Sequence, residues 1–243
     1  MDLIVSQAKI TEFSKKIIII VGGYGSGKSE VAVNLACYLK ANQDYDIAIA
    51  DLDIINPYFR SREAIKALTE LGIKSIVPEG GQFYADLPII LPEIKGAIEK
   101  NNDDLLILDV GGDDTGSRVL SSLSDAFVNV EYEMLLVLNA RRPFTSNLEE
   151  STKMIKDIEK SSRLKFTGLI SNTHLMENTT KEIILEGVEL ARVVSKKLNL
   201  PLLFVSGLKN ILKEIDGTKL NEATLPLERQ LLKPWEIKNT RPI

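Results

Sequence analysis

Between Gly22 and Ser29 the sequence reads GGYGSGKS, which matches the phosphate-binding pattern G-x-x-x-x-G-K-[ST]. The glycines let successive backbone N–H groups turn toward a phosphate, Lys28 carries a charge that reaches the outer phosphates, and Ser29 offers a hydroxyl to Mg²⁺. An apolar run precedes the motif and a helical pattern follows it, as this mechanism requires. We therefore expect a phosphate loop for a nucleoside triphosphate, formed by Gly22, Gly23, Tyr24, Gly25, Ser26, Gly27, Lys28, Ser29 and Glu30.

Three carboxylates follow other apolar runs and are suited to work with this loop. Asp109 lies in LLILDVGG, where a phosphate loop needs an acidic partner for Mg²⁺ at the end of a neighbouring strand. The following Gly111 and Gly112 let the backbone approach a γ-phosphate. Asp51 and Asp53, in IAIADLDII, are suited to polarise an attacking water or to ligate Mg²⁺ through water.

Continuous apolar runs indicate strands that are buried on both faces, as in a parallel sheet. They cover Ile17–Val21, Ile47–Ala50, Leu105–Leu108, Met134–Leu138, Phe166–Ile170 and Leu202–Val205. Helical patterns lie between them, at Lys28–Ala41, Arg60–Leu71 with Gly72 as C-terminal cap, Asn147–Ser161 and Thr180–Leu198. Ser146 with Glu149, and Thr179 with Glu182, have the spacing of capping boxes.

This alternation predicts an α/β fold of three layers, with a mostly parallel sheet and helices on both faces. A length of 243 residues with 44% hydrophobic residues fits a single domain over 1–243, with a core at about 15–206. The stretch Pro78–Pro92 mixes aromatic and turn residues and is not assigned to an element. The tail at about 226–243 is expected to be an extended arm on the domain or on a partner.

Composition narrows the classes of function. A net charge of -4 provides no general positive field for a nucleic-acid backbone, so nucleic-acid binding is not the favoured function. Cys37 is the only cysteine, which excludes an internal disulfide and favours a reducing cytoplasm. No apolar run approaches the length of a membrane span. His174, the only histidine, either lines a base pocket or, as we favour, makes a structural hydrogen bond.

GGYGSGKS, DLDIINP and ILDVGG together resemble the nucleotide-binding domain of the MinD/ParA and cobyrinic-acid-synthase group, the SIMIBI class of P-loop NTPases. The resemblance spans roughly residues 17–205. It implies that Asp53 positions the attacking water, that Asp51 lies near Mg²⁺, and that Asp109 is the Walker B residue. In GLISNTH it implies that Asn172 hydrogen-bonds the adenine of ATP.

The sequence departs from that group at one position. MinD/ParA proteins carry an additional lysine early in the loop, which reaches the phosphates of a partner across a dimer, and Gly23 stands there in this chain. Another cation, such as Arg118, Arg141 or Arg142, replaces it, or the protein is not activated by dimerisation. Arg141 and Arg142 follow an apolar run and would lie at the edge of the sheet that bears the site.

Three functions are compatible with these residues. The first is a switch that binds and hydrolyses Mg-ATP under the control of a protein partner or a homodimer. The second is an ATP-dependent ligase or kinase that resembles dethiobiotin synthetase, activates a carboxylate, and holds a small-molecule second substrate with Asn56–Arg62, Arg141 and Arg142. The third is a non-catalytic nucleotide-binding subunit. The presence of Lys28, Ser29, Asp53 and Asp109 favours the ATPase.

Overall fold

Eight parallel strands form one sheet in the part of the chain that the structure, a computed structural model, describes: residues 10, 13–42, 46–53, 62–76, 87–100 and 105–228. In chain order the strands are β1 (Ile17–Gly22), β2 (Ile47–Asp51), β3 (Ile73–Ile76), β4 (Leu105–Gly111), β5 (Tyr132–Leu138), β6 (Gly168–Ser171), β7 (Leu202–Leu208) and β8 (Thr224–Leu227). Their order in the sheet is β3-β2-β4-β1-β5-β6-β7-β8. The predicted parallel α/β architecture is confirmed.

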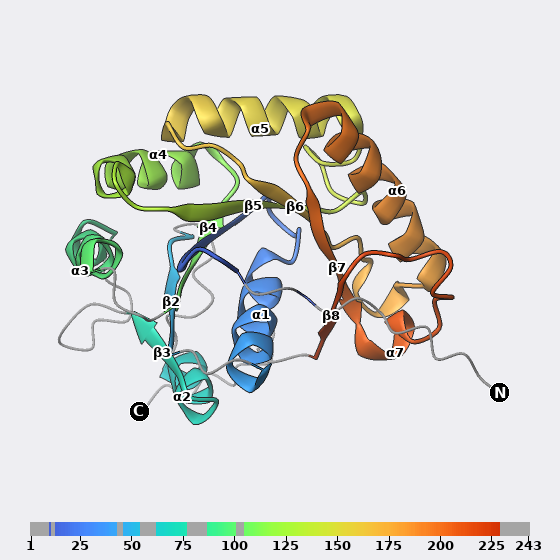
Figure 1. Cartoon of the computed structure of the whole chain (residues 1–243), viewed down its shortest axis with the longest axis horizontal. Helices are drawn as coiled ribbons and strands as arrows, with labels where there is room; N and C mark the ends of the chain where they lie inside the picture. Colours follow the sequence, from blue (N-terminus) through green and yellow to red (C-terminus); the bar gives the residue numbers. More distant parts are fainter. Residues whose placement is uncertain are drawn as a thin grey trace, which may run out of the picture.

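Helices cover both faces of this sheet (Figure 1). On one face lie α1 (Lys28–Asn42) and α2 (Arg62–Glu70), and on the other lie α3 (Leu87–Lys100), α4 (Asp114–Leu123), α5 (Leu148–Ser162) and α6 (Lys181–Leu198). The short α7 (Lys209–Leu212) packs beside β7 and β8. Two 3-10 turns cover Ser124–Phe127 and Met176–Asn178.

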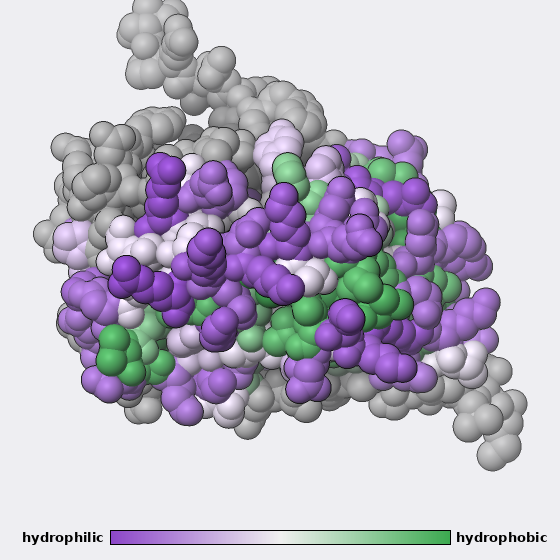
Figure 2. Space-filling view, turned by 90° about the horizontal axis from the view of Figure 1, so that it is seen from above, coloured by the Kyte–Doolittle hydropathy of each residue, from purple (hydrophilic) through white to green (hydrophobic). Residues whose placement is uncertain are grey.

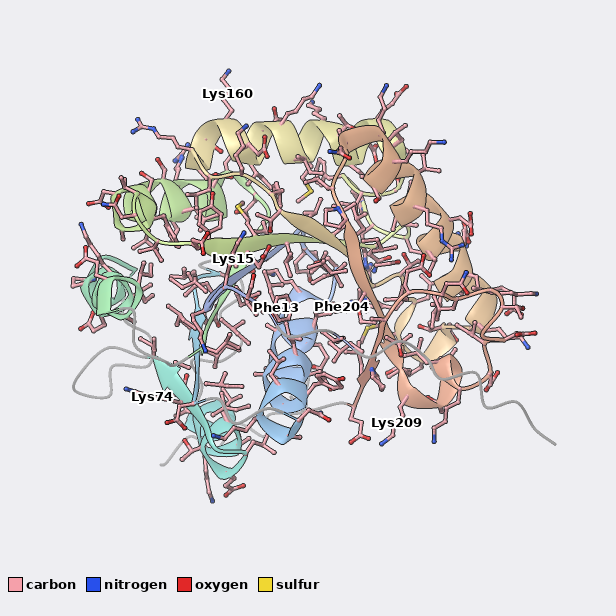
Figure 3. All side chains as sticks on the ribbon, viewed as in Figure 1. Phe13, Lys15, Lys74, Lys160, Phe204 and Lys209 are labelled. Atoms are coloured by element: carbon pink, nitrogen blue, oxygen red, sulfur yellow. The ribbon has the colours of Figure 1, made fainter. Side chains whose placement is uncertain are left out.

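The strand β1 shows why a continuous apolar run was needed. Ile17, Ile19 and Val21 pack into the core under α3 to α6, whereas Ile18 and Ile20 pack into the core under α1. Because successive side chains of a strand point to opposite faces, a strand between two helical layers must be apolar at every position. Phe204 of β7, fully buried, fills the core on the α1 side (Figure 3).

The outer surface of the helices is polar by contrast. The face seen from above in Figure 2, over α4, α5 and α6, is largely hydrophilic, with one broad apolar patch right of its centre and smaller ones elsewhere. Lys160 projects outward from α5 (Figure 3). Within the described ranges no helix is long and apolar enough to cross a membrane.

Several elements differ from the sequence-based expectations. The strands β3 and β8 and the helices α3, α4 and α7 were not predicted. Residues 87–92 of the unassigned stretch belong to α3, which contains Pro92. Residues 226 and 227 belong to β8, so the expected arm starts inside the sheet; residues 229–243 lie outside the described part.

Both predicted capping boxes are wrong by one residue. Asn147, not Ser146, caps α5, and its side chain accepts a hydrogen bond from the backbone N–H of Glu150. Thr180, not Thr179, precedes α6, and its side chain makes no capping bond to the backbone. Asn is as good an N-cap as Ser, so the tertiary position of the helix decides between adjacent cap residues.

The strand β1 lies between β4 and β5. From β1 the chain passes to β2, β3 and β4 on one side of it, and from β4 it crosses to β5, β6, β7 and β8 on the other side. Such a reversal of strand order opens a crevice beyond the carboxyl ends of the strands, where ligands of open α/β sheets bind. The phosphate loop follows β1 directly, so the fold places it in this crevice.

Candidate nucleotide-binding site

The phosphate loop joins the end of β1 to the first turn of α1. Gly25 has φ +73° and Gly27 has φ +82°, values that side-chain-bearing residues rarely adopt. A Cβ atom on Gly27 would lie 2.4 Å from Asn172 Nδ2, so a larger residue does not fit there. The loop therefore needs glycine at these two positions both for its backbone conformation and for its close neighbours.

Lys28 forms a buried ion pair with Asp53. Its Nζ lies 2.5 Å from Asp53 Oδ2, and both side chains are less than a tenth exposed. Burial opposes the charge of Lys28, but the carboxylates of Asp109, Asp53 and Asp51 outweigh it and raise the pKa of the ammonium above its usual value. Lys28 is therefore charged, and Asp53 binds its ammonium group.

Ser29, in the first turn of α1, contacts Asp109 of β4. The Ser29 hydroxyl donates to Asp109 Oδ2 at 2.5 Å, while Asp109 Oδ1 is buried and has no hydrogen-bond partner. A hydroxyl next to a carboxylate oxygen with spare capacity is the set of oxygen ligands that Mg²⁺ uses together with phosphate oxygens. Within the described residues no three His, Cys, Asp or Glu side chains form a metal cage of their own, so the arrangement fits a metal that is shared with a nucleotide.

Burial also perturbs Asp109 itself. Complete desolvation raises its pKa to about 7, against the opposing attraction of Lys28. The carboxylates of Asp51 and Asp53 add to the rise. Ionisation of Asp109 is thus costly, and a metal cation bound beside its carboxylate would reduce that cost.

The other two predicted carboxylates lie nearby. Asp51 pairs in register with Asp109 at the ends of β2 and β4, and Asp51 Oδ1 accepts a hydrogen bond from the backbone N–H of Asp53 at 3.0 Å. The N–H of Leu52 bonds the carbonyl of Asp109 at 2.8 Å, which fixes the two strand ends to each other. The structure therefore brings Lys28, Ser29, Asp51, Asp53 and Asp109 together.

Asn172 lies on the opposite side of the loop, after β6. Its Nδ2 donates to the carbonyl of Ser26 at 2.8 Å, and its Oδ1 accepts from the hydroxyl of Ser206 at 2.9 Å. Each atom keeps one further hydrogen-bonding position, so contact with a base is compatible with this arrangement. Asn172 thus connects the end of β6 to the phosphate loop.

His174 contacts the same part of the loop. Its Nδ1 accepts a hydrogen bond from the backbone N–H of Met176 at 3.3 Å, and its Nε2 is buried without a partner close to Gly27. Burial and the charge of Arg142 lower the pKa of His174, so the ring is neutral with its proton on Nε2.

Four of the five buried side-chain atoms without a hydrogen-bond partner in the described ranges surround this loop: Ser26 Oγ, Asp109 Oδ1, Ser171 Oγ and His174 Nε2. Buried polar groups are nearly always satisfied in folded proteins. Their concentration here indicates a ligand site.

The remaining candidates are placed differently. Tyr24 is 82% exposed at the tip of the loop. The side chain of Glu30 contacts its own helix, α1, where its carboxylate accepts a hydrogen bond from Asn34 Nδ2 at 3.1 Å. Arg118 lies exposed on α4, and Arg141 pairs with Glu186 at the surface. Arg142 alone of these three arginines contacts the loop, with its Nε 3.0 Å from the carbonyl of Gly25.

Sequence reasoning missed two residues of this site. Asn139, fully buried at the end of β5, places its Nδ2 3.5 Å from the Gly25 carbonyl, and Ser206 in β7 orients Asn172. Asn139 follows an apolar run just as Asp109 lies at the end of one, so the same rule applies to it. No sequence signal distinguishes Ser206.

No family model matches this chain, and no curated protein matches it. Solved structures do resemble it. Chloroplast FtsY from Physcomitrella patens has a TM-score of 0.54 and 17% identity, over 91% of this chain and 64% of that chain. FtsY from Mycoplasma mycoides has a TM-score of 0.50 and 23% identity, over 80% of this chain and 62% of that one.

A third structure is the signal recognition particle receptor FtsY from Elizabethkingia anophelis, in complex with GDP. Its TM-score is 0.50 and its identity 16%, over 79% of this chain and 57% of that chain. This chain spans less than two thirds of the length of each of these three proteins. The likeness confirms the predicted P-loop NTPase fold.

Proposed function

We propose that this protein binds Mg-ATP in the crevice at the end of β1 and hydrolyses it as a switch that a protein partner reads. The observation that carries the proposal is the meeting of Lys28 with Asp53 and of Ser29 with Asp109 beside the glycine loop. A glycine-rich turn without a ligand gives no reason to bury one ammonium and three carboxylates together.

Each group has a part in this proposal. Backbone N–H groups of the loop bind the phosphates, and Lys28 exchanges Asp53 for the outer phosphates. Ser29 and Asp109 hold Mg²⁺, with Asp51 behind them; the metal would neutralise charge that develops on the phosphates. Asp53, released from Lys28, orients the attacking water.

Adenine is favoured over guanine by the segment after β6. Guanine presents N–H donors that a carboxylate accepts well, whereas the first residues after β6, 172–176, contain no Asp or Glu, and the next residue, Glu177, is exposed in the following turn. The FtsY complex with GDP makes guanine the natural competitor. Comparing affinities for ATP and GTP tests this part of the proposal.

Exposed apolar side chains near the loop support a protein partner. Tyr24, Phe144 and Met176 are 82%, 68% and 45% exposed, and Phe144 and Met176 have positive φ. Exposed apolar side chains on residues with strained backbone conformations are suited to contact the surface of another protein. A second copy of the chain is one candidate for that surface.

The test combines nucleotide titration with phosphate release from Mg-ATP, in the parent and in Lys28→Ala. We expect tight binding and measurable turnover in the parent and neither in the variant. Equal binding by both proteins would refute the loop assignment. Tight binding with negligible turnover would instead favour the ligase or kinase that needs a second substrate.

A further inference from the structure

A second loop, residues 139–145 after β5, contacts the phosphate loop through a side-chain hydrogen bond. Gly25 and Ser26 carry consecutive backbone carbonyls, and both accept hydrogen bonds from side chains of other elements. Arg142 Nε donates to Gly25 at 3.0 Å, and Asn172 Nδ2 donates to Ser26 at 2.8 Å. These two bonds fix the backbone of the loop, and phosphate loops bind phosphate through backbone N–H groups.

The loop of residues 139–145 is itself rigid. Thr145, which is buried, donates through Oγ1 to the carbonyl of Asn139 at 2.9 Å. Asn139 Oδ1 accepts from the backbone N–H of Arg141 at 2.9 Å, and the Asn139 carbonyl also accepts from the N–H of Arg142 at 3.0 Å. The backbone of Arg142 is thus fixed by its neighbours before any ligand arrives.

The charge of Arg142 is not neutralised by a carboxylate. In the described part of the chain, Arg141 forms an ion pair with Glu186, and Arg192 forms one with Glu222. Arg142 forms no ion pair with any described residue, and its two terminal nitrogens donate no hydrogen bond to one. Its side chain is half-buried against Gly25, where a Cβ atom would lie 2.8 Å from Nε. A half-buried guanidinium with four unused N–H donors is suited to bind an anion.

We propose that Arg142 is an anion-binding residue in cis: its Nε is anchored on the Gly25 carbonyl, and its terminal nitrogens bind the phosphate chain of a nucleotide held by the same loop. This inference rests on the proposed function. The positive charge at the phosphates then comes in part from the β5–α5 loop of the same chain, and a partner subunit is not needed to supply it.

The experiment measures the affinities of the full chain for Mg-ATP and for inorganic tripolyphosphate, which has no base. The variants are Arg142→Ala, Arg142→Gln and Arg142→Lys, with Arg141→Ala as the matched control on the same loop. Thermal unfolding of each variant confirms that it is folded. Lys28→Ala reports separately on the phosphate loop.

We expect Arg142→Ala to weaken both ligands by about tenfold to a hundredfold, as the loss of a charge-assisted hydrogen bond implies. Arg141→Ala should stay within about twofold of the parent, because its surface ion pair contributes little. Arg142→Lys should recover part of the affinity. Arg142→Gln should not, since it keeps a donor for Gly25 but carries no charge.

Three results would overturn the inference while leaving the proposed function intact. The first is binding that is lost in Lys28→Ala but unchanged in Arg142→Ala. The second is an effect on ATP without an effect on tripolyphosphate, which would place Arg142 at the base. The third is recovery of ATP binding when Arg142→Ala is mixed with Lys28→Ala, because the arginine would then act in trans. A parent that binds neither ligand would overturn the proposed function, and this inference with it.

Discussion

One buried ammonium faces three carboxylates at the centre of the site. Lys28 contacts Asp53 directly, and the charges of Asp109 and Asp51 act on it as well. Desolvated charges are tolerated only when they are paired, which accounts for the contact between Lys28 and Asp53. In the proposed function a nucleotide displaces this pair, so the binding of phosphate is linked to the release of Asp53.

Asp53→Ala should separate binding from turnover. Removing the carboxylate leaves Lys28 without the partner with which phosphate competes, so affinity for Mg-ATP should be unchanged or higher. Turnover should fall by about a hundredfold or more, the usual contribution of a positioned base. Titration and single-turnover phosphate release measure the two effects; normal turnover would remove Asp53 from the mechanism.

Asp109 makes stability depend on pH. Burial raises its pKa from 3.8 to about 7, so between these values the folded chain holds a proton that the unfolded chain has lost. This contribution to stability is complete below pH 3.8 and is lost as the pH rises to about 7. The ligand-free protein should therefore lose stability from this group as the medium approaches neutrality.

Asp109→Asn should abolish that dependence. From pH 5 to pH 7 the unfolding free energy of the parent should fall relative to the variant by up to about 1.4 kcal/mol per pH unit. Urea unfolding in EDTA, without nucleotide, measures the difference, and the variant should also lose Mg²⁺-dependent turnover. Parallel pH profiles for the two proteins would show that Asp109 is ionised throughout the range.

At the scale of elements, the contact between α4 and the end of β4 is unusually close. A Cβ atom on Gly116 of α4 would lie 1.9 Å from the carbonyl oxygen of Gly111. The backbone N–H of Gly112 in turn bonds the Gly22 carbonyl at 2.9 Å. The helix α4 therefore packs closely on the end of β4, the strand that carries Asp109. The residue after this strand is hydrogen-bonded to the start of the phosphate loop.

Gly116→Ala should destabilise the protein by about 1–3 kcal/mol despite the better helix propensity of alanine, because the clash is with backbone. Gly96→Ala in α3 is the matched control, since nothing lies within 4 Å of the added Cβ atom. That change should be neutral or stabilising by up to about 1 kcal/mol. Chemical unfolding compares the two, and equal losses would mean that α4 does not pack as closely as described.

At the scale of the whole molecule, the site draws on the central strands of the sheet. Lys28 follows β1, Asp51 ends β2, and Asp109 lies two residues before the end of β4. Asn139 and Asn172 follow β5 and β6. A ligand that contacts all these strand ends binds only when the sheet is assembled. Its binding free energy is then added to the stability of the entire fold.

Mg-ATP at a concentration of 100 times its dissociation constant should stabilise the parent by about 2.7 kcal/mol. Lys28→Ala should show no such gain at the same concentration. Thermal unfolding with and without nucleotide measures the shift. A comparable shift in Lys28→Ala would place the nucleotide away from the loop.

The sequence by itself determined the fold class, and it pointed to the glycine loop and to the three carboxylates that the structure brings together. These features are local: an apolar run predicts a buried strand, and a polar residue at its end lies at the ligand-binding edge of a parallel sheet. For that reason Asp51, Asp53 and Asp109 were found before the structure. The six predicted strands lie where expected, to within a few residues.

Only the tertiary structure decided how these residues are partnered. The Lys28–Asp53 ion pair and the bracing of Gly25 and Ser26 by Arg142 and Asn172 join residues far apart in the chain. The short edge strands β3 and β8 were also not predicted. Each has too few apolar residues to show a strand pattern and is recognised as a strand only by its pairing with β2 or β7. Local sequence patterns predict which segments form strands and helices. Contacts between distant segments cannot be predicted from these patterns, because they depend on how the whole sheet assembles.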